Sequence, residues 1–131
     1  MNVPSVKVDI APGELIDKIT ILTIKSERME DIEKVQHVEI ELEILTAARD
    51  EALNQSESLN KLSTKLKEVN ECLWIIEEDI RVCEAAKDFG NHFIELARSV
   101  YKQNDERTRL KREINNLLGS RILEQKSYKP Y

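Results

Sequence analysis

Apolar residues recur between residues 59 and 83 at alternating intervals of three and four positions. This spacing places them on one face of an α-helix, in the heptad pattern typical of helices that pack lengthwise against one another. Ser56 or Ser58 can cap the start of this helix, and we expect it to run to about Lys87. The positions in the pattern are Leu59, Leu62, Leu66, Val69, Leu73, Ile76, Ile80 and Cys83.

Three further segments show helical spacing. Pro12 suits the first helical position and Glu14 suits the first turn, although Ala11 before them is a poor N-cap. The expected helices cover residues 12–29, 32–53 and 91–118.

Changes in the pattern mark where these helices end. The apolar spacing shifts in phase near residues 30–32, where Asp31 can cap a new helix. We expect Gly90, in the left-handed conformation that glycine tolerates, to end the third helix, and Gly119 to end the fourth.

Two regions carry more apolar surface than one helix bundle can cover. Ile21 and Ile24 lie opposite the main apolar face of the first helix, and Trp74 and Ile75 leave the seam of the third. A helix that is apolar on both sides has to be covered on both sides. We therefore expect a homodimer with these residues at its interface.

The two ends of the chain have weaker patterns. Residues 3–10 alternate between apolar and polar side chains, as a short β-strand does, and residues 120–131 form a tail. The whole pattern predicts an all-α protein, an antiparallel bundle of four long helices with a short N-terminal strand and a C-terminal tail. We expect a single domain over residues 1–131.

Composition limits the class of protein. No apolar run reaches the roughly 18 residues that span a bilayer, and the first residues lack the charged start and apolar run of a secretory signal. We therefore expect a cytoplasmic protein with no membrane partner. Cys72 and Cys83 lie too far apart along one helix to form a disulfide, so we expect both to be buried packing residues.

Charge is distributed unevenly. The formal net charge of −5 argues against a nucleic-acid partner. Residues 1–97 hold 11 basic and 21 acidic residues, whereas residues 98–131 hold 9 basic and 4 acidic residues. Either acidic helices pack beside a basic one, or the basic region forms a local anion site.

The inward face of the last expected helix turns polar midway. Asn104, Arg107 and Lys111 occupy positions where its apolar seam would continue. In an antiparallel hairpin of the last two helices, Arg107 would lie beside Glu71 and Lys111 beside Glu68. Two interpretations stay open: ion pairs that fix the alignment of the helices, or an interior pocket in which Arg107 binds a carboxylate or phosphate.

Several blocks of sequence have a familiar order. They are APGELIDKITIL at residues 11–22, Lys126-Ser127-Tyr128 near the end, and the segments 45–49, 70–79 and 97–101. Together they resemble a family of short, uncharacterised bacterial and phage proteins, over nearly the whole chain. The resemblance implies one compact domain and no assigned activity.

The stretch LIDKI in the first expected helix also resembles the first helix of the all-helical chorismate mutases. Those enzymes hold a dianionic substrate among cations from several helices and stabilise its developing charge. The resemblance covers only this helix, from Leu15 through Arg28. It makes Lys18 and Arg28 candidate anion-binding residues, with Arg107 and Lys111 of the last helix able to serve beside them, and Asn104 joins them through its place in the polar seam.

The sequence contains no motif that predicts a metal, a cofactor or a catalytic residue. Neither His37 nor His92 follows a glutamate by three residues, as the ligands of di-iron bundles do. The isolated histidines offer no Ser-His-Asp arrangement, and the chain has no glycine-rich phosphate loop. We expect no metal and no cofactor.

Two functions remain in view. The leading interpretation is a non-enzymatic interaction or scaffold protein that acts through a helical surface, as a homodimer and with a protein partner. The alternative is a binder of a small anionic metabolite, or an enzyme acting on one, with its pocket near Arg107. An interaction protein should expose apolar surface and keep Arg107 paired, whereas a binder should have a cavity with Arg107 or Lys18 unpaired.

Overall fold

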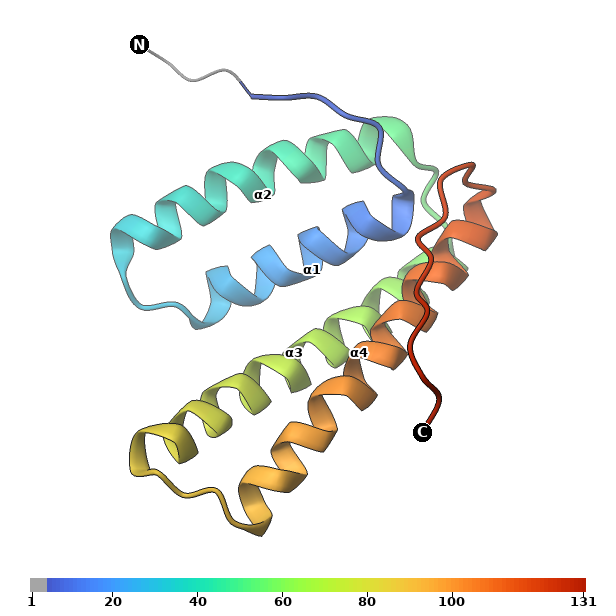
Figure 1. The fold of residues 1–131 in the computed structure, drawn as a ribbon. Helices are drawn as coiled ribbons and strands as arrows, with labels where there is room; N and C mark the ends of the chain where they lie inside the picture. Colours follow the sequence, from blue (N-terminus) through green and yellow to red (C-terminus); the bar gives the residue numbers. More distant parts are fainter. Residues whose placement is uncertain (1–4) are drawn as a thin grey trace.

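The computed structural model describes residues 5–131, which form four α-helices and no β-strand (Figure 1). The helices are α1 (Pro12–Arg28), α2 (Ile32–Ala52), α3 (Glu57–Ala86) and α4 (Asn91–Leu118). The expected helices are confirmed, and their ends agree with expectation to within one turn. In the described part of the chain, no helix is long and apolar enough to cross a membrane.

The strand expected at the N-terminus is not shown. Residues 5–10 precede α1 without regular structure. Val6 and Val8, which share one face of the expected strand, are 84% and 70% exposed. The start of the expected strand, at residues 3 and 4, lies outside the described residues.

The helices form two hairpins that stack through α1 (Figure 1). α1 packs against both helices of the α3–α4 hairpin, and α2 packs on α1. Within residues 5–131, α2 contacts no other helix, so the expected bundle is open along one side. The cause lies in the sequence of α2, where Val38 is the only buried side chain. One narrow apolar face can cover only one neighbouring helix.

The position of α1 between two layers explains its unusual sequence. Leu22 is 4% exposed and Ile24 is 2% exposed, so apolar residues on different sides of α1 are covered within one chain. Ile24 therefore needs no second subunit to cover it. Ile21 and Trp74 are half-buried, and Ile75 is exposed.

The hydrophobic core lies where α1 crosses the α3–α4 hairpin. It consists of Ile16, Leu59, Leu66, Leu110 and Ile114, each at most 2% exposed. The seam of α3 supplies two of these residues, as its spacing predicts. Beyond the crossing, α3 and α4 face mainly each other, and we call residues 74–100 the distal hairpin. Exposed apolar side chains of the distal hairpin are Ile75, Val82, Phe89 and Ile94.

The ends of the helices follow the expected caps with one exception. Asp31 and Ser56 accept hydrogen bonds from backbone N–H groups of the first turns of α2 and α3. The left-handed residue that ends α3 is Lys87, with φ of 55°, whereas Gly90 has φ of −77° and precedes α4. The expected role of Gly90 is therefore wrong, because α3 ends soon after its last seam residue. Gly119, with φ of 66°, ends α4 as expected.

The two cysteines have different environments. Cys83 is 5% exposed and packs in the seam of α3, as expected. Cys72 is exposed, so its expected role as a buried packing residue is wrong. It precedes the seam position Leu73 and points away from the packed face.

Candidate functional site

A buried ion pair joins α1 to α4. Asp17 is 0% exposed. Nε of Arg107 donates to Oδ1 of Asp17 at 2.8 Å, and Nη2 donates to Oδ2 at 2.5 Å. This bidentate geometry matches the planar guanidinium to the carboxylate. The hydrogen bond to Asp17 is the main reason that the pKa of Arg107 is raised above its ordinary value.

Asn70 of α3 completes this cluster. Its Nδ2 donates to Oδ1 of Asp17 at 3.0 Å and to Oγ1 of Thr20 at 2.8 Å. The Thr20 hydroxyl in turn donates to the backbone carbonyl of Asp17 at 2.7 Å. We call Asp17, Thr20, Asn70 and Arg107 the polar cluster. It ties α1, α3 and α4 together and satisfies both carboxylate oxygens.

A second ion-pair group lies one turn along α4. Lys111 is 8% exposed. Its Nζ lies 2.7 Å from Oε2 of Glu14 and 2.8 Å from Oε2 of Glu124, so it joins α1, α4 and the tail. Burial lowers the pKa of Lys111, but the hydrogen bonds to Glu124 and Glu14 outweigh it and raise the pKa overall. The bond to Lys111 in turn lowers the pKa of Glu124.

Gly13 allows α1 to approach α4 closely enough for these contacts. Its backbone N–H donates to Oδ1 of Asn115 at 2.8 Å. A Cβ atom at this position would lie 2.4 Å from the backbone oxygen of Lys111, so a larger residue would push the two helices apart. The first turn of α1 therefore depends on glycine for packing.

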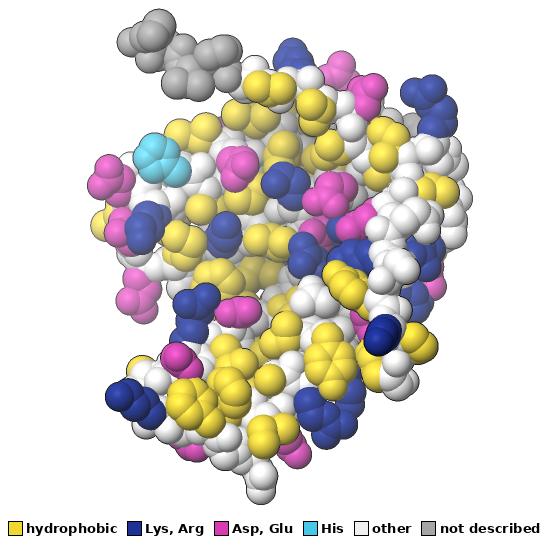
Figure 2. Space-filling view, in the orientation of Figure 1, with side chains coloured by type: hydrophobic (Ala, Val, Ile, Leu, Met, Phe, Trp, Pro, Cys, Tyr) yellow, Lys and Arg dark blue, Asp and Glu magenta, His cyan; other side chains and the backbone are white. Residues whose placement is uncertain are grey.

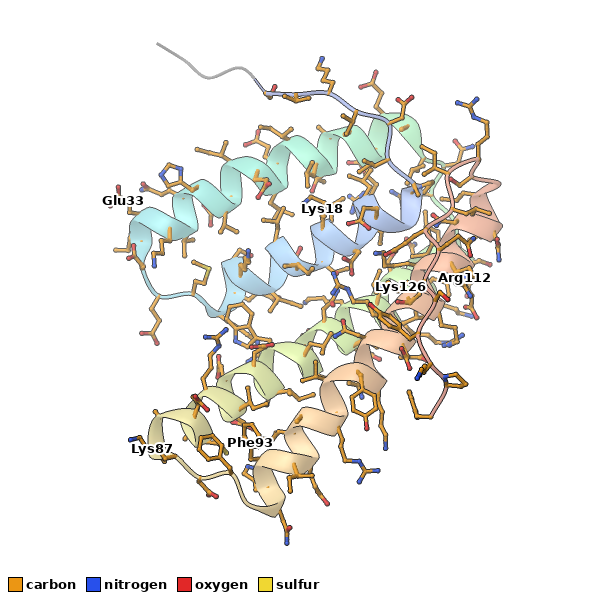
Figure 3. All side chains as sticks on the ribbon, in the orientation of Figure 1. Lys18, Glu33, Lys87, Phe93, Arg112 and Lys126 are labelled. Carbon is orange, nitrogen blue, oxygen red and sulfur yellow. The ribbon has the colours of Figure 1, made fainter. Side chains whose placement is uncertain are left out.

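The sequence-predicted anion-binding residues divide into two groups. Asn104, Arg107 and Lys111 line one small cavity. Lys18 is exposed and does not line this cavity (Figure 3). Arg28 instead lies 3.6 Å from Glu71 in an ion pair between α1 and α3.

The expected partners of the basic residues are wrong. Arg107 contacts Asp17 instead of Glu71, and Lys111 contacts Glu14 and Glu124 instead of Glu68. The cause is the position of α1, which lies over the groove between α3 and α4 and brings its own carboxylates to α4. One feature of the sequence indicated this position of α1.

That feature is the spacing of residues on α1. Gly13, Asp17, Thr20 and Ile24 recur at helical intervals and share one face. A glycine and a carboxylate among apolar residues on a covered face indicate close approach and a buried partner. Asn70 carried no such signal, because it lies beside the seam of α3.

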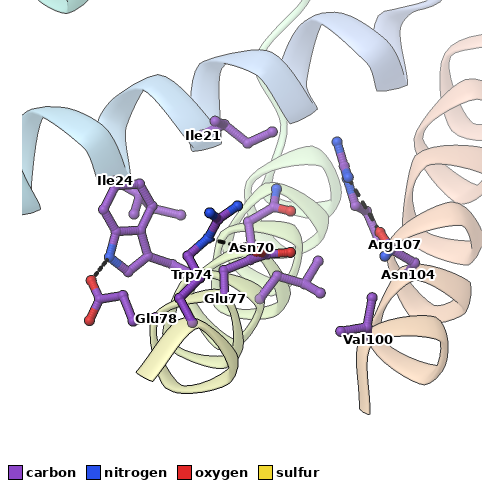
Figure 4. A pocket seen from close by; sticks show the side chains of 11 residues that line it. Ile21, Ile24, Asn70, Trp74, Glu77, Glu78, Val100, Asn104 and Arg107 are labelled. Carbon is purple, nitrogen blue, oxygen red and sulfur yellow. Dashed lines mark hydrogen bonds and ion pairs between the residues drawn. The ribbon is translucent and has the colours of Figure 1, made fainter. Parts of the chain in front are cut away.

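A larger cleft opens where α1 and the distal hairpin diverge (Figure 4). Its volume is about 540 Å³, and it is lined by apolar and polar side chains. The apolar ones are Ile21, Ile24, Leu73, Trp74 and Val100, and Asn70, Asn104 and Arg107 are among the polar ones. The Trp74 ring lies along this wall, and its Nε1 donates to Oε1 of Glu78 at 2.5 Å. Three of the four expected interface residues line the cleft, and Ile75 is exposed elsewhere on α3.

The tail forms a further cavity against α4. Its volume is about 810 Å³. The Tyr131 hydroxyl donates to Oδ2 of Asp105 at 2.7 Å, and its ring meets Tyr101 edge to face, with centroids 5.1 Å apart. These contacts hold the end of the chain along α4.

Within the described residues, no group of three or more His, Cys, Asp or Glu side chains is placed to hold a metal ion. The same residues leave no buried side-chain nitrogen or oxygen without a hydrogen-bond partner. The buried polar groups therefore form closed networks.

Comparison with known proteins gives one match. No curated protein and no solved structure matches the chain. A family of unknown function, DUF6165, matches residues 6–131, which include all four helices, the polar cluster and the tail. The chain belongs to this family.

Proposed function

We propose that this protein is a non-enzymatic helical interaction or scaffold protein that works as a homodimer. The observation that carries this proposal is the pairing of Arg107. The residue best placed to bind an anionic substrate donates two hydrogen bonds to the buried carboxylate of Asp17. Apolar side chains, in contrast, face an open cleft.

The geometry gives less support to an enzyme of the chorismate-mutase type. Such an enzyme needs several cations directed at one dianionic substrate. Here Lys18 and Arg28 lie away from Arg107, and Arg28 pairs with Glu71. Of the four candidate cations, Lys18 and Arg28 thus lie apart, and Arg107 and Lys111 pair with carboxylates of the chain itself.

The cleft between α1 and the distal hairpin is the surface that we propose for dimerisation. Its wall is apolar except for Asn70, Asn104 and Arg107, and its rim carries Glu77, Glu78 and Arg81. In a two-fold dimer each rim meets its own copy, so Arg81 of one chain can pair with a glutamate of the other. Apolar side chains are also exposed over the distal hairpin (Figure 2).

The dimer can be tested by replacing one residue of the cleft. Ile21→Glu places a charge in the apolar wall, which should be tolerated in a monomer but not in a desolvated interface. We expect wild type at twice the chain mass of 15.2 kDa and the variant at the chain mass, measured by light scattering coupled to size exclusion.

Ile40→Glu on α2 is the matched control, because Ile40 is 58% exposed and lies outside the cleft. It should keep the mass of wild type. Circular dichroism checks that both variants stay helical. A monomeric wild type would refute the dimer, and an unchanged mass in Ile21→Glu would refute this interface.

The proposal extends to a protein partner. A homodimer built through the cleft leaves the outer face of α2 accessible, where Ile40 and Ile44 are 58% and 63% exposed. We propose this face as the surface for a partner. A cytoplasmic location and a bacterial or phage origin stay predictions from the sequence.

A further inference from the structure

We propose that the small cavity under the C-terminal tail binds an oxyanion of phosphate size, and that the Glu124 carboxylate occupies this site when no ligand is bound. The proposal does not depend on the dimer. It concerns a second cavity, formed by one side of α4, the start of α1 and the tail, which shares Asn104 and Arg107 with the cleft.

Cations converge on this cavity. Its volume is about 250 Å³, and its walls include Arg107, Lys111 and Lys126. Lys126 lies on the tail where it runs along α4 (Figure 3). Positive charges from α4 and the tail thus face one small space, a typical arrangement for binding an anion.

The anion now in this space belongs to the chain itself. Oε2 of Glu124 lies 2.8 Å from Nζ of Lys111, and Oε1 lies 3.8 Å from Nζ of Lys126. The two carboxylate oxygens therefore lie between two ammonium groups. A phosphate brings more charge and a further pair of acceptor oxygens to the same donors.

The other carboxylates near the cavity are held more firmly. Both oxygens of Asp17 accept hydrogen bonds from Arg107, and the side chain is buried. The backbone of Glu14 is held on the first turn of α1, beside the close contact at Gly13, although its side chain is 41% exposed. Asp17 therefore cannot leave the site without disturbing the fold, and Glu14 can only turn its side chain outward, whereas Glu124 can move together with the tail.

Glu124 can leave the site because its part of the tail is exposed and has no regular structure. Residues 121–131 are all exposed. The side chain of Glu124 is itself 40% exposed, and ion pairs with such exposure add little to stability. A ligand therefore competes with a weak internal contact.

Polar groups on α4 supply directional recognition. Oδ1 of Asn104 accepts from Nη1 of Arg107 at 3.4 Å, which leaves its Nδ2 group to donate to a ligand. The cavity is smaller than the usual pocket for a cofactor or drug-sized ligand. The ligand class is thus inorganic phosphate or the phosphoryl group of a small metabolite.

The adjoining cavity offers space for the rest of such a metabolite. It shares Asn104, Thr108 and Lys126 with the smaller cavity. Its walls also carry Tyr101, Tyr128 and Tyr131.

Thermal shift with inorganic phosphate tests the site. Sodium chloride at matched ionic strength controls for screening. Phosphate should raise the melting temperature of wild type above the chloride value. Glu124→Gln removes the internal competitor, so the apparent Kd for phosphate should fall by about fivefold relative to wild type.

Two further variants separate this site from a general effect of charge. Glu113→Gln removes one negative charge, as Glu124→Gln does, but Glu113 lies on α4 outside the cavity, where it pairs with Arg109. Its affinity for phosphate should equal that of wild type. The double variant Glu124→Gln/Lys126→Met should lose the increase in phosphate affinity that Glu124→Gln shows. Lys126 is exposed, so its replacement should not disturb the fold.

Three results would overturn the proposal. Phosphate that stabilises no variant more than chloride does would show that there is no oxyanion site. An equal increase in phosphate affinity in Glu113→Gln and Glu124→Gln would show that the increase comes only from the change in net charge. Equal affinities in wild type and Glu124→Gln would show that Glu124 does not occupy the site.

Discussion

The pair formed by Asp17 and Arg107 ties the stability of the fold to single side chains. Taking a carboxylate out of water costs free energy, which here is offset by the bidentate contact and by Asn70. A buried pair contributes modestly as a unit, but loss of one partner leaves the other charged and unpaired. The cluster therefore favours one alignment of α1 on the α3–α4 hairpin.

Arg107→Leu should lower the free energy of unfolding by about 3–5 kcal/mol, because Asp17 would stay buried without its main partner. The double variant Asp17→Leu/Arg107→Leu should lose less than the single variant, since neither charge remains. Urea unfolding of wild type and the variants measures these differences.

Arg109→Leu gives the matched control. Arg109 pairs with Glu106 and Glu113 on the exposed side of α4, so its loss should cost much less free energy of unfolding than the loss of Arg107. A cost for Arg107→Leu no larger than that for Arg109→Leu would contradict a structural role for the buried pair.

For single residues, the sequence predicted which face of a helix a side chain occupies better than it predicted which residue that side chain contacts. Polar residues at seam positions identified Asn104, Arg107 and Lys111 as inward-facing, since helical spacing fixes which face a residue occupies. The sequence pattern did not predict that Arg107 binds Asp17, because the two residues lie on helices that are far apart in the chain. Helical spacing carries no information on which other helix lies across the groove.

The helices and their ends were the part of this fold that the sequence predicted best. Helical spacing and caps are local properties, so the four helices follow from the chain itself. The error at Gly90 is also local. A lysine took the left-handed position because α3 ended before the glycine, and the hydrogen bonds of Lys87 to the carbonyls of Cys83 and Glu84 stabilise it there.

α2 should be the least stable helix. It packs on α1 alone and buries only Val38, whereas α3 buries Leu59 and Leu66 in the core. Local opening follows the number of buried apolar contacts. Amide hydrogen exchange in α2 should be at least tenfold faster than in residues 59–70, a difference of about 1.4 kcal/mol in opening free energy.

Val38→Ala gives an internal check. It should speed exchange further in α2 but leave exchange in residues 59–70 nearly unchanged. Equal protection of α2 and of residues 59–70 would mean that α2 opens only when the whole fold unfolds, contrary to its single-sided packing.

The whole molecule shows why the expected four-helix bundle is open along one side of α2. The sequence predicted surplus apolar surface on α1, and the interpretation assigned it to a second subunit. Within one chain, α1 instead lies between α2 and the α3–α4 hairpin, which covers it from different sides. Periodicity gives the direction of an apolar face but not the element that covers it. Two stacked hairpins and a closed four-helix bundle can therefore have the same apolar pattern in the sequence.

The tail is joined to α4 by the contact of Glu124 with Lys111 and of Tyr131 with Asp105, and the first of these contacts should depend on pH. The bond to Lys111 lowers the pKa of Glu124 below its ordinary value of 4.5. A carboxyl group whose pKa is lowered in the folded state stabilises the fold above its unfolded pKa. That contribution is lost as the pH falls through the folded pKa.

The difference in unfolding free energy between wild type and Glu124→Gln should therefore be largest from about pH 5 upward, at about 1 kcal/mol or less because Glu124 is partly exposed. It should shrink toward zero in acid, since protonated Glu124 and glutamine are both neutral. Urea unfolding of the two proteins across this range measures the difference. If it stayed constant in acid below the folded pKa, the stabilisation would not come from the charge of Glu124, and the tail would have to be held by its tyrosine contacts instead.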